Sequence, residues 1–138
     1  MSRRLFLLII PIFALLALES YSAKRACDDS DVKLAINPKN KKFPKIMDTC
    51  ASDAWGDASK TTKCLKKQYP QLSDKCAACF GKMADCSASN CKFKCMGNHF
   101  SDGCLACVEN NCRGTVKDSK FSLTNCTGLK AKQLPPKK

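Results

Sequence analysis

The hydrophobic pattern of the chain is built mainly from cysteine and alanine, and it repeats with the spacing of a helix. Cysteines three or four positions apart share one helix face. Three pairs have this spacing: Cys76 and Cys79, Cys91 and Cys95, and Cys104 and Cys107. Ile46, Met47, Cys50, Ala54 and Ala58 lie on one stripe, with Trp55 beside it. This stripe predicts an earlier amphipathic helix over residues 46–58.

Two segments with the same polar start contain the Cys-x-x-Cys pairs. The pattern Ser-Asp-x-Cys-x-Ala-Cys occupies residues 73–79 and again residues 101–107. Serine and aspartate accept hydrogen bonds from the unpaired amides of a first helical turn, so both segments predict helix starts. A short helix bearing cysteine is expected before each, with Cys64 in the first case and Cys91 and Cys95 in the second. We therefore expect two stacked helical hairpins, each cross-linked through its Cys-x-x-Cys helix. The similarity between residues 73–79 and residues 101–107 reflects either an internal duplication or only shared helix-start chemistry.

Composition favours helices and disulfides over sheets and a large apolar core. Only five Val and Ile residues follow residue 22, against 12 Ala and 20 Lys, so β-forming side chains are scarce. The 12 cysteines are a share of the chain that is typical of disulfide scaffolds. The predicted fold class is therefore all-α: a small disulfide-rich bundle of five or six short helices arranged as helical hairpins.

The N-terminus has the three regions of a secretory signal peptide. Arg3 and Arg4 precede an apolar run over residues 5–18, and the small residues Ser22 and Ala23 follow it. The run is shorter than the roughly 18 residues that a membrane-spanning helix needs, although a retained signal anchor is the alternative. No second run of this kind follows, so we expect no transmembrane span. These features predict a secreted, extracellular protein.

Changes in charge and cysteine content divide the chain into four parts. Residues 1–22 are expected to be the signal peptide, and residues 23–45 a basic N-terminal segment or linker with two prolines. Residues 46–127 are the expected disulfide-stapled helical domain. Residues 128–138 are expected to be a basic, solvated tail.

All 12 cysteines follow the expected signal peptide, and their even number allows complete pairing. In an extracellular protein we expect up to six disulfides, although spacing alone does not select the connectivity. The expected half-cystines are Cys27, Cys50, Cys64, Cys76, Cys79, Cys86, Cys91, Cys95, Cys104, Cys107, Cys112 and Cys126. Four thiolates from two Cys-x-x-Cys pairs could instead hold zinc. A redox role would need a thioredoxin-like parallel sheet, which this composition does not favour. We expect no metal and no cofactor.

The chain offers few residues for catalysis. His99 is the single histidine, which excludes two-histidine ribonuclease chemistry because acid and base both need groups that titrate near neutrality. His99 lies near Asp102, but secreted phospholipases A2 carry aspartate directly after the histidine, where this chain has Phe100. Glu109 is the one glutamate after residue 22, so a glycosidase carboxylate pair is poorly supported. We predict a polar turn histidine, no catalytic residues and no enzymatic activity.

Basic side chains are the other clear signal. Lys and Arg number 24 against 12 Asp and Glu, a formal net charge of +12, and a field of this sign attracts anionic surfaces. The candidate anion contacts are Lys41, Lys42, Lys63, Lys66, Lys67, Lys92 and Lys94. Lysine is a hydrated point charge without the rigid fork of arginine, so solvated surface charge is the simplest alternative role. The lack of clustered aromatic residues and the secretory context argue against nucleic acid as a partner.

The tripeptide Asn125-Cys126-Thr127 matches the acceptor sequence for N-glycosylation. Its middle residue is expected to be disulfide-bonded, which can bury the site. Asn125 is therefore a candidate for glycosylation whose occupancy the sequence does not decide.

Two functions from different classes fit these observations. The first is a secreted, non-enzymatic protein, toxin-, effector- or pheromone-like, that docks a rigid basic surface on an extracellular target. The second is lysine-mediated binding of anionic membranes, glycosaminoglycans or metal oxyanions. The lysine-rich, cysteine-rich helical character is also similar to that of tunicate vanadium-binding proteins, in which lysines and backbone groups hold an oxo-cation. The cysteines of that family are denser and differently spaced, so no residue is transferred.

Overall fold

The computed structural model describes residues 25–114 and 116–138, so the expected signal peptide lies outside the described residues. Within these two ranges the chain is helical and forms no β-strand. Its one extended pairing is an isolated bridge between Arg113 and Ser122. The predicted all-α fold is confirmed.

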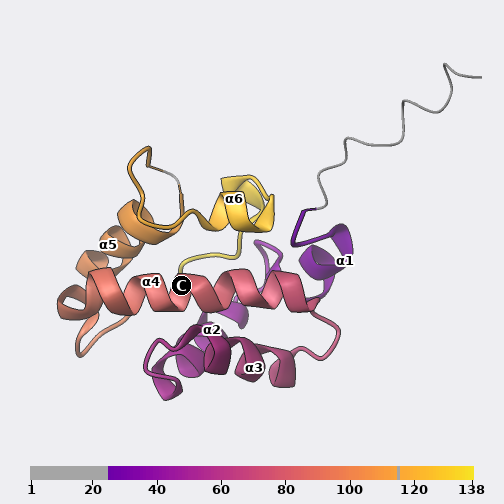
Figure 1. Cartoon of the computed structure of the whole chain (residues 1–138), viewed down its shortest axis with the longest axis horizontal. Coiled ribbons are helices and arrows are strands. Elements are labelled where there is room, and N and C mark those ends of the chain that lie inside the picture. The colour runs from indigo at the N-terminus through magenta and orange to yellow at the C-terminus, as the bar shows by residue number, and fades with distance from the viewer. Residues whose placement is uncertain (1–24, 115) are drawn as a thin grey trace, which may run out of the picture.

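One long helix organises the molecule. The four main helices are α2 (Phe43–Asp53), α3 (Ala58–Gln68), α4 (Asp74–Cys95) and α5 (Asp102–Cys112). Short helices α1 (Asp29–Asp31) and α6 (Leu123–Thr127) lie near the chain ends, a π-helical turn (Val32–Ile36) follows α1, and a 3-10 turn (Ala131–Gln133) follows α6. In Figure 1, α4 runs through the middle, with α2 and α3 on one side and α5 and α6 on the other.

Serine caps fix the beginnings of α4 and α5. The Ser73 hydroxyl accepts from the backbone N–H of Cys76 at 3.3 Å, and the Ser101 hydroxyl accepts from that of Cys104 at 3.2 Å. Each cap satisfies an amide that has no partner within its own helix. Both predicted helix starts are confirmed.

The helix predicted over residues 46–58 is shifted and shorter. It begins at Phe43, with Pro44 in its first turn, where a missing N–H costs nothing. It ends at Asp53, because a turn through Trp55 and Gly56 separates α2 from α3. The sequence stripe therefore runs across two helices.

The continuous length of α4 differs most from the prediction. A separate short helix was expected to carry Cys91 and Cys95, but residues 74–95 form one helix of 22 residues. Gly81 in its middle does not break it. A Cβ at this position would overlap the Thr62 Oγ1 and the Ala58 carbonyl oxygen of α3. Glycine here allows two helices to pack at close range.

All twelve cysteines are paired, which confirms six disulfides. The bridges are Cys27–Cys76, Cys50–Cys64, Cys79–Cys126, Cys86–Cys112, Cys91–Cys107 and Cys95–Cys104. Five of the six have one cysteine on α4. Disulfides at this density are typical of small extracellular proteins.

Only one of the two expected hairpins is cross-linked as predicted. The α4–α5 hairpin holds three bridges, two of them through the Cys-x-x-Cys motif of α5 (Cys104 and Cys107). In the α3–α4 hairpin, Cys64 instead pairs with Cys50 of α2, so that bridge joins α2 to α3. Cys76 and Cys79 pair with Cys27 and Cys126, which lie in the first and last segments of the described chain. The first Cys-x-x-Cys helix therefore links both of these segments to the bundle.

The segments on either side of the expected domain contribute to the core. Ile36 and Phe43, from the segment expected to be a linker, are 0 % and 1 % exposed. Leu129 and Leu134, from the segment expected to be a solvated tail, are both 3 % exposed. Burying large apolar side chains away from water stabilises the folded state, which explains why both flanking segments pack on the bundle.

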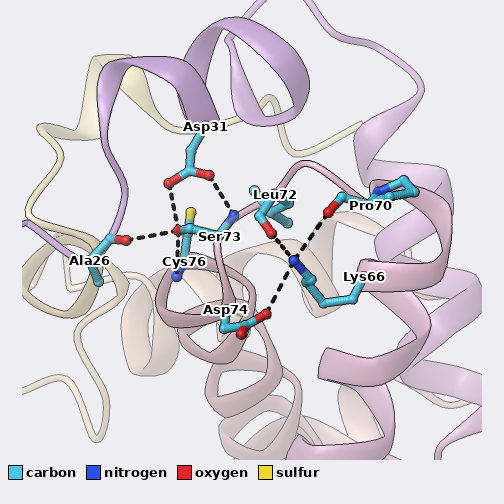
Figure 2. A network of polar contacts seen from close by, with 8 residues as sticks. All are labelled: Ala26, Asp31, Lys66, Pro70, Leu72, Ser73, Asp74 and Cys76. Atoms are coloured by element: carbon cyan, nitrogen blue, oxygen red, sulfur yellow. Dashed lines mark hydrogen bonds and ion pairs between the residues drawn. The ribbon is translucent and has the colours of Figure 1, made fainter.

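A polar network joins the N-terminal segment to the start of α4 (Figure 2). The Asp31 side chain, in a residue 2 % exposed, accepts from the backbone N–H and the hydroxyl of Ser73, both at 2.7 Å, and from the Asp28 N–H at 3.0 Å. Beside it, the Lys66 ammonium donates to the carbonyls of Leu72 and Pro70 and pairs with Asp74. The buried carboxylate is therefore satisfied by hydrogen bonds.

Candidate ligand-binding groove

A groove of about 600 Å³ lies between α2, α4, α5 and the C-terminal segment. On α2 it is lined by Met47 and Ala51, in the turn after α2 by Trp55, and on α4 by Ala84 and Ala88 among others. Positions four apart lie on one helix face, so each helix presents a continuous face to the groove. Many of these side chains are small, which leaves space where larger residues would interdigitate.

The base of the groove is apolar and adaptable. The buried rings of Phe43 and Phe80 meet edge to face with centroids 5.0 Å apart. Met47, Met83 and Met96, which are all the methionines after Met1, also line the groove. Methionine is flexible and polarisable, and it recurs at surfaces that accept varied apolar ligands.

Large apolar side chains stand exposed at the rim. Trp55, the single tryptophan of the chain, is 92 % exposed, and Met96 is 66 % exposed. Trp55 has a φ of 54°, a left-handed conformation that bulky residues rarely adopt. The following Gly56 lies so close to Ala88 of α4 that a Cβ would overlap the alanine methyl. The turn after α2 therefore packs on α4 and holds the indole outward.

The single histidine lies at the groove, in a contact that the sequence does not indicate. His99 Nδ1 is 2.7 Å from Asp48 Oδ1 and 3.4 Å from Ser52 Oγ, both on α2. Asp102, its neighbour in sequence, instead pairs with Lys138. The predicted turn location of His99 is confirmed.

A serine–histidine–aspartate relay needs serine at one ring nitrogen and the carboxylate at the other. Here both Ser52 and Asp48 meet the same nitrogen of His99. One nitrogen cannot donate to the carboxylate and also take a proton from the hydroxyl. The cluster therefore fixes the turn against α2 and does not form a hydrolytic relay.

The C-terminal segment forms one wall of the groove. It runs from α6 back to α4 (Figure 1), and Pro135, Pro136 and Lys137 line the groove. Arg113 donates to the Pro135 carbonyl at 3.1 Å. Glu109 lies 3.4 Å from Arg113 Nε and 2.9 Å from Lys137 Nζ. Burial lowers the pKa of Arg113 from its ordinary value, and the Glu109 carboxylate opposes that shift.

The seven candidate anion contacts do not form one cluster. Lys92 is the one that lines the groove. Lys66 is held by the carbonyls and carboxylate of the network in Figure 2. The others are exposed: Lys41 and Lys42 before α2, Lys63 and Lys67 on α3, and Lys94 on α4. Their role as anion contacts stays a prediction.

The remaining sequence features are placed as follows. Asn125 is exposed on α6, next to the Cys79–Cys126 bridge, and its glycosylation stays a prediction. The one group of three metal-type side chains found among the described residues is Cys27, Asp31 and Cys76, whose two sulfur atoms are bonded to each other. In the ranges that the structure covers, no helix is both long and apolar enough to cross a membrane.

The groove itself was missed by the sequence reasoning. Its walls come from residues near 47, 84, 105 and 135, which only the folded chain brings together. The usable signal was the placement of every methionine after Met1 on predicted helices or beside them, but methionine equally fills ordinary cores. No protein-family model, no curated protein and no solved structure matches this chain.

Proposed function

We propose that the protein is a non-enzymatic extracellular binding protein that holds the apolar part of its ligand in the groove between α2, α4 and α5. The observation that carries this proposal is the groove itself, mostly apolar and about 600 Å³ in volume. Ligand sites in proteins have volumes of roughly 300–1,000 Å³ and are lined mainly by apolar and aromatic side chains with a few polar groups. This groove fits that description.

The disulfides support a groove that exists before the ligand arrives. Three bridges hold α4 against α5, and Cys50–Cys64 holds α2 against α3. Binding to a preformed site loses less conformational entropy than binding that must order its own walls. Rigidity of this kind supports recognition of a ligand by shape.

The arrangement around His99 supports the non-enzymatic part of the proposal. His99 contacts Asp48 and Ser52 through the same nitrogen, so it cannot act as a base toward Ser52 while it is held by Asp48. The groove offers apolar surface and a few charges, which suit binding.

Lysine-mediated anion binding is the second candidate, and α3 carries the observation that favours it. Lys60, Lys63 and Lys67 recur at helical spacing and are exposed, and their ammonium groups have no ion-pair partner among the described residues. Attraction of this kind falls steeply by about 0.3 M salt as screening shortens, whereas binding in the apolar groove persists.

A pair of matched variants tests the groove. Ser87 lines it, and Ser89 lies two residues further along α4, is exposed and does not line it. The disulfide-intact protein is titrated with the neutral apolar fluorophore N-phenyl-naphthylamine. The Ser87→Phe ring fills part of the groove, so we expect at least about ten-fold weaker binding, while Ser89→Phe binds as the wild type does.

Circular dichroism and the absence of free thiols establish that both variants are folded. Equal binding by Ser87→Phe and the wild type would contradict the groove as the site. Binding of heparin or anionic vesicles that is lost by about 0.3 M salt, without any binding of the apolar fluorophore, would favour the second candidate instead.

A further inference from the structure

The basic side chains of the groove differ in whether an acid lies beside them. Among the described residues, Lys92, Arg113 and Lys137 line it, together with the single histidine, His99. His99 lies 2.7 Å from Asp48, while Arg113 and Lys137 lie 3.4 Å and 2.9 Å from Glu109. Lys92 has no ion-pair partner in the described part of the chain. It is therefore the groove cation that remains open to an external anion.

Lys92 lies beside the apolar part of the groove. It is exposed in the last turn of α4, four residues after Ala88 and four before Met96, and both of these residues also line the groove. A ligand that lies along this face therefore meets apolar side chains and one ammonium group together. Charge and apolar surface are adjacent on one helix face.

We propose that the ligand is a single-chain anionic amphiphile, such as a fatty-acid carboxylate, with its head group at Lys92 and its chain along the methionines that line the groove. This inference rests on the proposed function and adds the charge and the orientation of the ligand. The formal net charge of +12 favours anions over neutral or cationic ligands at long range. The ion pair at Lys92 then favours the anion at contact.

The form of the groove agrees with one alkyl chain. Its volume of about 600 Å³ is that of a site for one small ligand. Met47, Met83 and Met96 can change rotamer to follow chains of different length. Trp55 at the rim is the single tryptophan, so a chain that covers it changes an otherwise unique fluorescence signal.

The test compares three probes that share one chain and differ in the head group. Dodecanoate, dodecanol and dodecyltrimethylammonium are titrated below their micelle concentrations into the disulfide-intact protein, with Trp55 fluorescence and calorimetry as readouts. The variant is Lys92→Gln. The matched control is Lys94→Gln, which removes an exposed lysine that lies two residues away and does not line the groove.

We expect dodecanoate to bind about five-fold more tightly than dodecanol, and the cationic probe to bind most weakly. Lys92→Gln should remove most of the preference for dodecanoate over dodecanol and leave dodecanol binding unchanged, while Lys94→Gln keeps most of the preference. Equal affinities of wild type for dodecanoate and dodecanol, or equal effects of the two variants, would overturn the head-group assignment and leave the groove function intact. Failure of all three probes to bind, with no effect of Ser87→Phe, would overturn both.

Discussion

Gly81 on α4 provides a sharp test of how closely α3 and α4 pack. In an exposed helix interior, replacing glycine by alanine raises stability by about 1 kcal/mol, because alanine has the higher helix propensity. At Gly81 the new Cβ would overlap both the Thr62 Oγ1 and the Ala58 carbonyl oxygen of α3. A side chain can rotate away, but a backbone carbonyl within a helix cannot. The helices must separate, so the effect of the substitution should reverse sign.

The size of the effect follows from two opposing contributions. Forcing an extra carbon into a packed interface costs typically about 1–3 kcal/mol, and the backbone obstacle places Gly81→Ala near the top of that range. The propensity gain offsets about 1 kcal/mol. We therefore expect the free energy of unfolding to fall by about 2 kcal/mol.

The measurement is guanidinium denaturation of the disulfide-intact protein, followed by circular dichroism, with comparison of midpoint and slope. Gly103→Ala is the matched control, because Gly103 lies in the first turn of α5 and no other packed segment of the described chain comes within 4 Å of its Cβ position. This control should be neutral or slightly stabilising. A Gly81→Ala protein as stable as the wild type would refute the close approach of α3 and α4.

Three further substitutions test other parts of the structure by the same denaturation assay. Asp31→Asn should lower the free energy of unfolding by about 1–3 kcal/mol. Each oxygen of the Asp31 carboxylate accepts a backbone N–H, and an amide must turn its own NH₂ toward one of these two donors. Unchanged stability would contradict the network. Thr61→Val should be neutral or raise the free energy of unfolding by about 1 kcal/mol, because the fully buried Thr61 hydroxyl has no hydrogen-bond partner among the described residues; a clear loss would contradict this. Glu109→Gln should lower the free energy of unfolding by about 1–3 kcal/mol and speed amide hydrogen exchange in residues 129–138. The reason is that the Arg113 side chain, only 11 % exposed, loses its ion pair. Unchanged exchange would contradict this role of Glu109.

The local features of the fold could be predicted from the sequence because their causes are local. The starts of α4 and α5 follow from hydrogen bonds that Ser73 and Ser101 make three residues ahead. The pairing of Cys91 and Cys95 with the next Cys-x-x-Cys helix follows from spacing within a hairpin. Such features involve partners a few residues away or on the next helix of the same hairpin.

The features that the sequence did not reveal depend on contacts between distant segments. Cys64 was expected to cross-link its own hairpin, but its partner is decided by which face α3 turns toward α2. The reason for a glycine at position 81 is the close approach of α3, which the sequence does not show. The contact between His99 and Asp48 spans 51 residues, and no spacing rule connects them. The groove likewise joins segments that are far apart in the sequence, so its residues could not be selected in advance.

The disulfide connectivity has a consequence for the resistance of the protein to proteolysis. Every turn between Cys27 and Cys126 lies inside a loop closed by Cys27–Cys76 or Cys79–Cys126, since the two residues between these loops belong to α4. A single cut in any of these turns leaves both fragments covalently joined. Residues 127–138 are outside every such loop and contain four lysines. Trypsin-like cleavage there would detach one wall of the groove while the disulfide-linked bundle stayed whole.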